Sequence, residues 1–380
     1  MKLPIDHAGL RVAAGLACAL AASAIASCGG GSSDAARLPR GFYGITSLAP
    51  LDRKDFVRMG RADVGAFRFE ISWSAVQASR RAPFDWSPID HTVVRAARQG
   101  IALLPILIGT PRFDAPRCHC TSTIRVRTRL QRAGWQRFVR GAVRRYGRGG
   151  SLWHERPSLP RDPITKWQIW NEQNNPVDHN PPRVYARLVA LSRRAISSVD
   201  RTGELVLGGM FGTPNGSRKA GVSAWSYLNR LFKDGAGRDF DAVALHPYAP
   251  NLAGISYQIR RVRAVLDAHH AGSMPILVTE IGWGSSKERF PGTGSRGQVF
   301  NVGLEAQERK LESAFQLLTD RRRSWRIGAI FWFTWKDPRL PAPGLCAFCY
   351  SAGLYRANGR TAKPALRAYQ SFTHGSRPAR

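Results

Sequence analysis

The sequence predicts a single (β/α)8 TIM barrel, an α/β fold, on three observations. Eight short runs rich in β-branched and aromatic residues recur from residue 41 onward, and each is apolar on both faces, as buried parallel strands are. Longer amphipathic segments separate these runs, an alternation that favours a parallel sheet. The rival is a doubly wound sheet, but no Gly-rich phosphate-binding turn follows the first run. The barrel domain is therefore predicted over residues 41–374.

The predicted strands share high apolar content and a length suited to a barrel wall. In chain order they are FYGITS (42–47), AFRFEIS (66–72), IALLPILI (101–108), KWQIW (166–170), ELVLGGM (204–210), FDAVALH (240–246), PILVTEIGW (275–283) and IGAIFWFTW (327–335). Helices are predicted between them, with apolar residues at helical spacing, over 88–99, 130–145, 182–199, 224–232, 257–269 and 307–321. Long insertions follow the third, seventh and eighth strands, at the barrel face where active sites are built.

The N-terminus has the pattern of an export signal. Arg11 precedes an apolar run over 12–25 that is too short to span a membrane. The run ends in IASC and is followed by GGGSS, which resembles a bacterial lipobox with Cys28 as the lipidated residue. A lipoprotein-type signal peptide is thus predicted over 1–27 and a flexible tether over 28–40. The alternative is an ordinary secretory signal. Under both interpretations the protein is expected outside the cytoplasm, either anchored to the outer leaflet of the cell membrane or secreted.

Four cysteines remain after the predicted signal and lipobox. They form a CxC pair, Cys118 and Cys120, and a CxxC pair, Cys346 and Cys349. Disulfides are favoured in an oxidising compartment, and a cross-link between the two pairs stays open because a bridge within CxC would be strained. A metal site is the alternative for such spacings.

The chain is strongly basic, with 57 Lys and Arg against 26 Asp and Glu, a net charge of +31. No nucleic-acid partner is expected, because the arginines are scattered and no nucleic-acid motif is present. An exported protein of this charge would instead meet anionic lipid, wall polymers or acidic glycans. The alternative is a merely solvated basic surface. The chain ends in a short basic tail over 375–380, and a monomer is expected.

Two predicted strands end on carboxylates. The fourth ends in Asn171-Glu172 and the seventh contains Glu280. Because the carboxyl ends of barrel strands meet on one face, the two carboxylates are expected to converge. A carboxylate pair is what glycosidic cleavage requires, and aromatic surroundings suit a sugar. Such a site would need no metal and no other cofactor.

Several motifs in barrel order resemble the clan A retaining glycoside hydrolases. IWNE and VTEIGW resemble the two catalytic strands, FRFEISW resembles an R-x-x-x-x-W pattern, ALHPYAP resembles an H-x-Y pattern, and FWFTWKD resembles an aromatic eighth strand. The resemblance covers about residues 41–372 and is closest to family 39, the xylosidase and exopolysaccharide-hydrolase group, with family 5 cellulases next. Gln173 departs from the pattern, which usually has Pro after the Glu.

The resemblance implies roles for the polar residues at the strand ends. Glu172 would be the general acid and base, and Glu280 the nucleophile. Arg68 would hold Glu280 ionised, and the Tyr248 hydroxyl would orient it. Asn171 would donate a hydrogen bond to the sugar 2-hydroxyl.

The resemblance also implies substrate-binding roles for a second set of residues: His246, Trp73, Trp283 and Trp335. For Trp73 and Trp283 a place in the core is the alternative, and for His246 a structural role. Glu70, two residues after Arg68 on the same strand, is an alternative partner for that arginine.

The function expected from these residues is hydrolysis of a β-linked cell-surface or extracellular glycan, a polysaccharide or oligosaccharide, by a retaining two-carboxylate mechanism. One alternative is a catalytically idle surface lipoprotein that binds glycan. Another is a transglycosylase with the same site, which passes the glycosyl group to another sugar.

Overall fold

The computed structural model describes residues 38–115, 122–175, 180–213, 222–287, 297–339 and 346–374. The predicted signal peptide, Cys28, most of the predicted tether, Cys118, Cys120 and the predicted basic tail lie outside the described residues.

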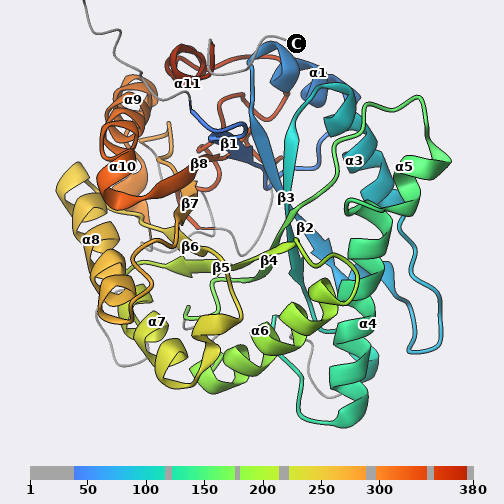
Figure 1. Ribbon diagram of the computed structural model, residues 1–380. Coiled ribbons are helices and arrows are strands. Elements are labelled where there is room, and N and C mark those ends of the chain that lie inside the picture. The colour runs from blue at the N-terminus through green and yellow to red at the C-terminus, as the bar shows by residue number, and fades with distance from the viewer. Residues whose placement is uncertain are drawn as a thin grey trace, which may run out of the picture. The chain divides into compact units, whose positions relative to one another are not determined.

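Eight parallel strands form a closed barrel in sequence order, which confirms the predicted fold class (Figure 1). They are β1 (Tyr43–Thr46), β2 (Ala66–Ser72), β3 (Ala102–Ile108), β4 (Lys166–Asn171), β5 (Glu204–Phe211), β6 (Val243–His246), β7 (Ile276–Ile281) and β8 (Ile327–Phe333). The ring closes where β1 pairs with β8. Each predicted strand overlaps an observed one, because strands buried on both faces carry a continuous apolar signal.

Helices surround the ring of strands (Figure 1). They are α1 (Arg53–Arg61), α2 (Trp73–Val76), α3 (Ser87–Arg98), α4 (Arg129–Tyr146), α5 (Ser151–Glu155), α6 (Pro182–Ser197), α7 (Ala224–Lys233), α8 (Leu252–Ala268), α9 (Leu304–Asp320), α10 (Arg322–Trp325) and α11 (Ala365–Thr373), with 3-10 turns η1 (Arg112–Asp114), η2 (Ala236–Arg238) and η3 (Gln298–Phe300). The α8 helix begins ahead of its predicted start at 257, because the Asn251 side chain caps it by accepting from the Gly254 amide. Within the described residues, no helix combines the length and apolarity that a membrane crossing requires.

The barrel interior has an apolar layer and a polar layer. The apolar layer consists mainly of small side chains: Ala66, Leu104, Val206, Ala242, Ala244, Leu277, Ala329 and Phe331. Every second residue of a strand points inward, so Arg68 and His246 lie on the same side as Ala66 and Ala244, nearer the carboxyl end. On β7 the register with β8 shifts between Val278 and Ile281. Such an irregularity changes which side chain points inward, and here it is Glu280.

Candidate active site

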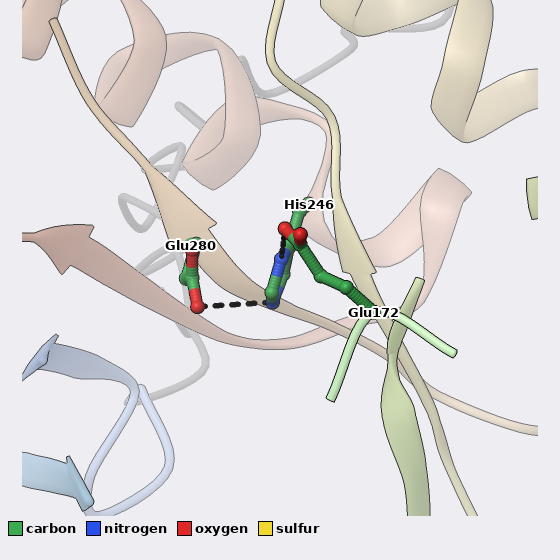
Figure 2. A group of neighbouring side chains, drawn as sticks. All are labelled: Glu172, His246 and Glu280. Carbon is green, nitrogen blue, oxygen red and sulfur yellow. Dashed lines mark hydrogen bonds and ion pairs between the residues drawn. The ribbon is translucent and has the colours of Figure 1, made fainter. Parts of the chain in front are cut away.

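Glu172 and Glu280 meet at the carboxyl end of the barrel, with the imidazole of His246 between them (Figure 2). His246 Nδ1 lies 2.8 Å from Glu172 Oε1, and His246 Nε2 lies 3.5 Å from Glu280 Oε1. One atom from each of the three side chains lies within 4.8 Å of the other two. The two glutamate side chains keep 20% and 11% of their surface exposed, whereas His246 is fully buried. The structure thus brings the two predicted carboxylates together.

The backbone that presents Glu172 is strained. Trp170 and Glu172 have φ values of 70° and 43°, in the left-handed region that non-glycine residues seldom adopt. Two hydrogen bonds hold the turn, from the Glu172 amide to the Gly209 carbonyl at 2.9 Å and from the Asn175 amide to the Glu172 carbonyl at 2.7 Å. Strain of this kind is retained where the surrounding structure enforces it, often at functional sites.

Glu280 is held by two donors. Arg68 Nη1 donates to Oε1 at 2.7 Å, and the Tyr248 hydroxyl donates to Oε2 at 3.0 Å. Burial by itself would raise the pKa of Glu280, but charge interactions with His246 and Arg68 oppose burial. Together with the two hydrogen bonds they leave the pKa of Glu280 below its ordinary value, so the carboxylate is kept ionised.

The Tyr248 hydroxyl remains a donor. Burial and the charges of Glu280 and Glu172 raise the pKa of Tyr248 well above its ordinary value, because each disfavours a phenolate.

Arg68 connects both ends of the site. Its side chain is 1% exposed, and besides Glu280 it donates to Gln168 Oε1 at 2.8 Å and to Asn171 Oδ1 at 2.6 Å. Its ion-pair partner is therefore Glu280 and not Glu70, the alternative from the sequence. Because the Asn171 carbonyl oxygen accepts from Arg68, the amide nitrogen is the group left to donate to a ligand.

Glu172 has two neighbours that hold its carboxylate. His246 contacts Oε1, and the Asn175 side chain donates to Oε2 at 2.8 Å. Gln173, which stands where the family pattern usually has Pro, is fully buried. Its side-chain amide donates to the Gly208 carbonyl at 3.3 Å, so the side chain lies against β5. A β-carbon on Gly209 would lie 2.0 Å from His246 Nε2, so glycine there makes room for the imidazole.

The three tryptophans predicted to bind substrate are buried in the core, so their role in substrate binding stays a prediction. Trp73 is 1% exposed and stacks on Phe138 with ring centroids 5.9 Å apart. Trp283 is 1% exposed and packs against Trp332. Trp335 is fully buried, and its Nε1 donates to an Asp55 carboxylate oxygen at 3.3 Å. Rings from other elements pack on Trp73, Trp283 and Trp335, and the Lys310 ammonium lies over the ring of Trp283.

The aromatic side of the site is built from residues that the sequence reading missed. Rings around Tyr248 come from β5, the β7 and β8 regions and the segment after β8: Phe211, Phe300, Phe333 and Phe348. Phe211 and Phe300 are only partly buried. The signal available in the sequence was the aromatic FWF of β8, whereas Phe211, Phe300 and Phe348 stand in no motif. Gln168 and Asn175 were also missed, although both flank the IWNE motif.

A disulfide joins Cys346 to Cys349, with their Cα atoms 5.2 Å apart. This decides the pairing for the CxxC cysteines, so a cross-link from them to the CxC pair and a metal site made of their thiolates are both absent from the structure. The bridge spans Phe348, whose ring centroid lies 5.3 Å from that of Tyr248. It therefore shapes the segment that packs on the site.

Glu172, His246 and Glu280 lie close enough together to share a metal ion, and within the described residues they form the group of potential ligands that does so. The Arg68 guanidinium lies 2.7 Å from the Glu280 oxygen that faces His246. A fixed cation at that oxygen opposes a divalent metal and favours a free carboxylate. Metal-free chemistry, as expected from the sequence, remains a prediction.

Known structures share the fold of this chain. A family 39 glycoside hydrolase from Bacteroides cellulosilyticus WH2 is 19% identical with a TM-score of 0.64, over 89% of this chain and 64% of its own length. A monomeric β-xylosidase from Caulobacter crescentus CB15 is 17% identical with a TM-score of 0.59, over 89% of this chain and 69% of its own. A GH5_18 protein from Bifidobacterium longum subsp. infantis is 12% identical with a TM-score of 0.62, over 90% and 80%.

These structural neighbours are glycoside hydrolases, and the chain has their (β/α)8 fold. The chain spans just under two thirds of the Bacteroides protein. No protein-family profile matches the sequence, and no curated protein sequence is similar to it.

Proposed function

We propose that the protein is a retaining glycoside hydrolase that cleaves a β-linked glycan. One observation carries the proposal: the Glu280 carboxylate, held by Arg68 and Tyr248, lies with Glu172 and His246 in a cluster whose ligand atoms are within 4.8 Å of one another. Retaining enzymes, which work by double displacement, have the two carboxyl groups about 5–5.5 Å apart, whereas inverting enzymes need roughly 6.5–9.5 Å between them to admit a water. The close approach of Glu172 and Glu280 therefore favours double displacement.

In the first step, Glu280 attacks the anomeric carbon while the glycosidic bond breaks. Glu172 gives its proton to the departing oxygen, so the products are a glycosyl ester of Glu280 and a free alcohol. The Asn171 amide donates to the sugar 2-hydroxyl, a bond that strengthens as positive charge develops on the ring. Arg68 and Tyr248 keep the attacking carboxylate ionised and aimed.

In the second step, Glu172 acts as a base. It takes a proton from water, whose oxygen attacks the anomeric carbon, and the ester bond to Glu280 breaks. A sugar hydroxyl in place of water would make the enzyme a transglycosylase. An idle glycan-binding barrel is the other alternative, but a binding role alone would not require an ionised, buried carboxylate aimed beside a second one.

The proposed substrate class rests on the similar structures. The Caulobacter crescentus protein is a monomeric β-xylosidase, and this supports a β-linked substrate and a monomer here.

The test is Glu280→Ala, assayed on 4-nitrophenyl β-glycosides with and without sodium azide. Turnover should be lost, and azide should partly restore it with a glycosyl azide of inverted configuration as the product. A matched control is Glu305→Ala, which changes an exposed glutamate on α9 and should leave turnover intact. Full activity of Glu280→Ala without azide would reject the assignment.

We also propose that the protein works outside the cytoplasm, held on the membrane by a lipid on Cys28. The support is the lipobox-like IASC followed by a Gly/Ser tether, and the net charge of +31 would favour anionic lipid or wall polymer. The Cys28→Ala variant should leave the membrane fraction, while Cys18→Ala, within the same apolar run, should stay there. Retention of Cys28→Ala on membranes would reject the lipid anchor.

A further inference from the structure

A third carboxylate, that of Glu70, stands at the mouth of the barrel. On β2 the inward positions alternate, from Ala66 in the apolar layer to Arg68 in the polar layer and then to Glu70. Arg68 reaches Glu280 directly, so the next inward position lies above the cluster of the two catalytic carboxylates. The proposed mechanism does not use Glu70.

The Glu70 side chain is open to solvent and lies within reach of the charges of the site. The residue is exposed, yet burial by the protein around it raises its pKa, and the charge of Glu280 raises it further against the opposing effect of Arg68. Its carboxylate has no hydrogen bond or ion pair within the described part of the chain.

The nearest cation does not satisfy Glu70. The three donor nitrogens of Arg68 that form hydrogen bonds go to Gln168, Glu280 and Asn171. Glu70 therefore presents free acceptor oxygens beside the reacting groups, where a bound ligand would supply the donors. Partly desolvated carboxylates make strong hydrogen bonds to hydroxyl groups.

We infer that Glu70 is a specificity-determining residue that accepts hydrogen bonds from hydroxyl groups of the sugar ring being cleaved, and that it excludes rings bearing a carboxylate. The inference rests on the proposed glycosidase function. Glu70 and Glu280 place two carboxyl groups beside a single guanidinium, and that guanidinium already pairs with Glu280. A uronate ring would add a further negative charge without a free cation to receive it, which is how a site discriminates against a competing ligand.

The charge at the proposed cleavage site therefore differs in its effect from the net charge of the whole protein. The net charge of +31 can hold an anionic lipid or polymer at the surface. Among the described residues, the cation that acts on Glu70 is Arg68, which already pairs with Glu280, so we expect the ring that is cleaved to be neutral or to carry an amino group.

The test compares kcat/KM on 4-nitrophenyl β-D-glucoside, β-D-mannoside and β-D-xyloside with that on the β-D-glucuronide. The wild type should prefer the best neutral glycoside over the glucuronide. Glu70→Gln should shrink this preference by roughly 10- to 100-fold, the effect of one charged hydrogen bond or one like-charge contact. Glu70→Asp keeps the charge, so it should still reject the glucuronide while cleaving the neutral glycoside more slowly.

The matched control is Glu204→Gln, a glutamate at the opposite end of the barrel where β5 begins, whose ion pair is with Lys166. It should leave the preference unchanged. A wild type that prefers the glucuronide, or a folded Glu70→Gln with the wild-type preference, would overturn the inference and leave the hydrolase proposal standing. A wild type that cleaves none of the four glycosides would overturn both.

Discussion

Replacing Arg68 by Met should damage the site and the fold together. The guanidinium is 1% exposed and makes three hydrogen bonds of 2.6–2.8 Å, including the ion pair with Glu280. Met has a similar length but no donor. The substitution therefore leaves a buried carboxylate beside His246 without the guanidinium that pairs with it.

The magnitude follows from the loss of a buried partner. Breaking one side of a buried pair costs about 3–5 kcal/mol of unfolding free energy at pH 7. The same loss in the transition state corresponds to a fall of roughly 10²–10⁴-fold in kcat/KM. In the wild type the pKa of Glu280 is lowered, so its contribution to stability is present above the ordinary carboxyl pKa and is lost as pH falls through the lowered value.

In the Arg68→Met variant burial dominates and raises the pKa of Glu280, so protonation relieves the cost at mildly acidic pH. The stability gap between wild type and variant should thus be large at pH 7 and smaller at pH 4. Urea unfolding at both pH values and kcat/KM on a 4-nitrophenyl β-glycoside measure the two effects.

The control is Arg145→Met, which removes an ion pair with Asp90 on the outer helices, where Arg145 is 16% exposed. It should lower stability without lowering kcat/KM. Two results would refute the reasoning. One is a folded Arg68→Met variant with kcat/KM within tenfold of the wild type. The other is a difference in unfolding free energy between wild type and variant that is as large at pH 4 as at pH 7.

Two further outcomes are expected. Tyr248→Phe removes the 3.0 Å hydrogen bond to Glu280 and should lower kcat/KM by roughly 10-fold, with unfolding barely changed; an unchanged kcat/KM would show that the hydroxyl does not orient the nucleophile. Replacing Cys346 and Cys349 together by Ser should lower the unfolding free energy by about 2 kcal/mol, the value for so short a closed loop, and added reductant should then have no further effect on the CxxC segment. Equal stability of the oxidised wild type and the double variant in urea would contradict that estimate.

Local periodicity in the sequence was enough to predict the barrel. A strand buried on both faces must be apolar throughout, and a surface helix must be apolar on one side, so β2, β7 and α9 could be recognised without knowledge of their neighbours. The convergence of Glu172 and Glu280 follows equally directly, because parallel strands bring their carboxyl ends to one face.

Contacts between segments far apart in the chain were decided only by the tertiary structure. Phe138, from α4, stacks on the ring of Trp73 in the core. The shifted register of β7 against β8 selects Glu280 as the partner of Arg68, and leaves Glu70 unpaired at the barrel mouth. Which ring face is covered, and which carboxylate a buried cation selects, depends on atoms brought together by folding, so a pattern within one segment cannot show it.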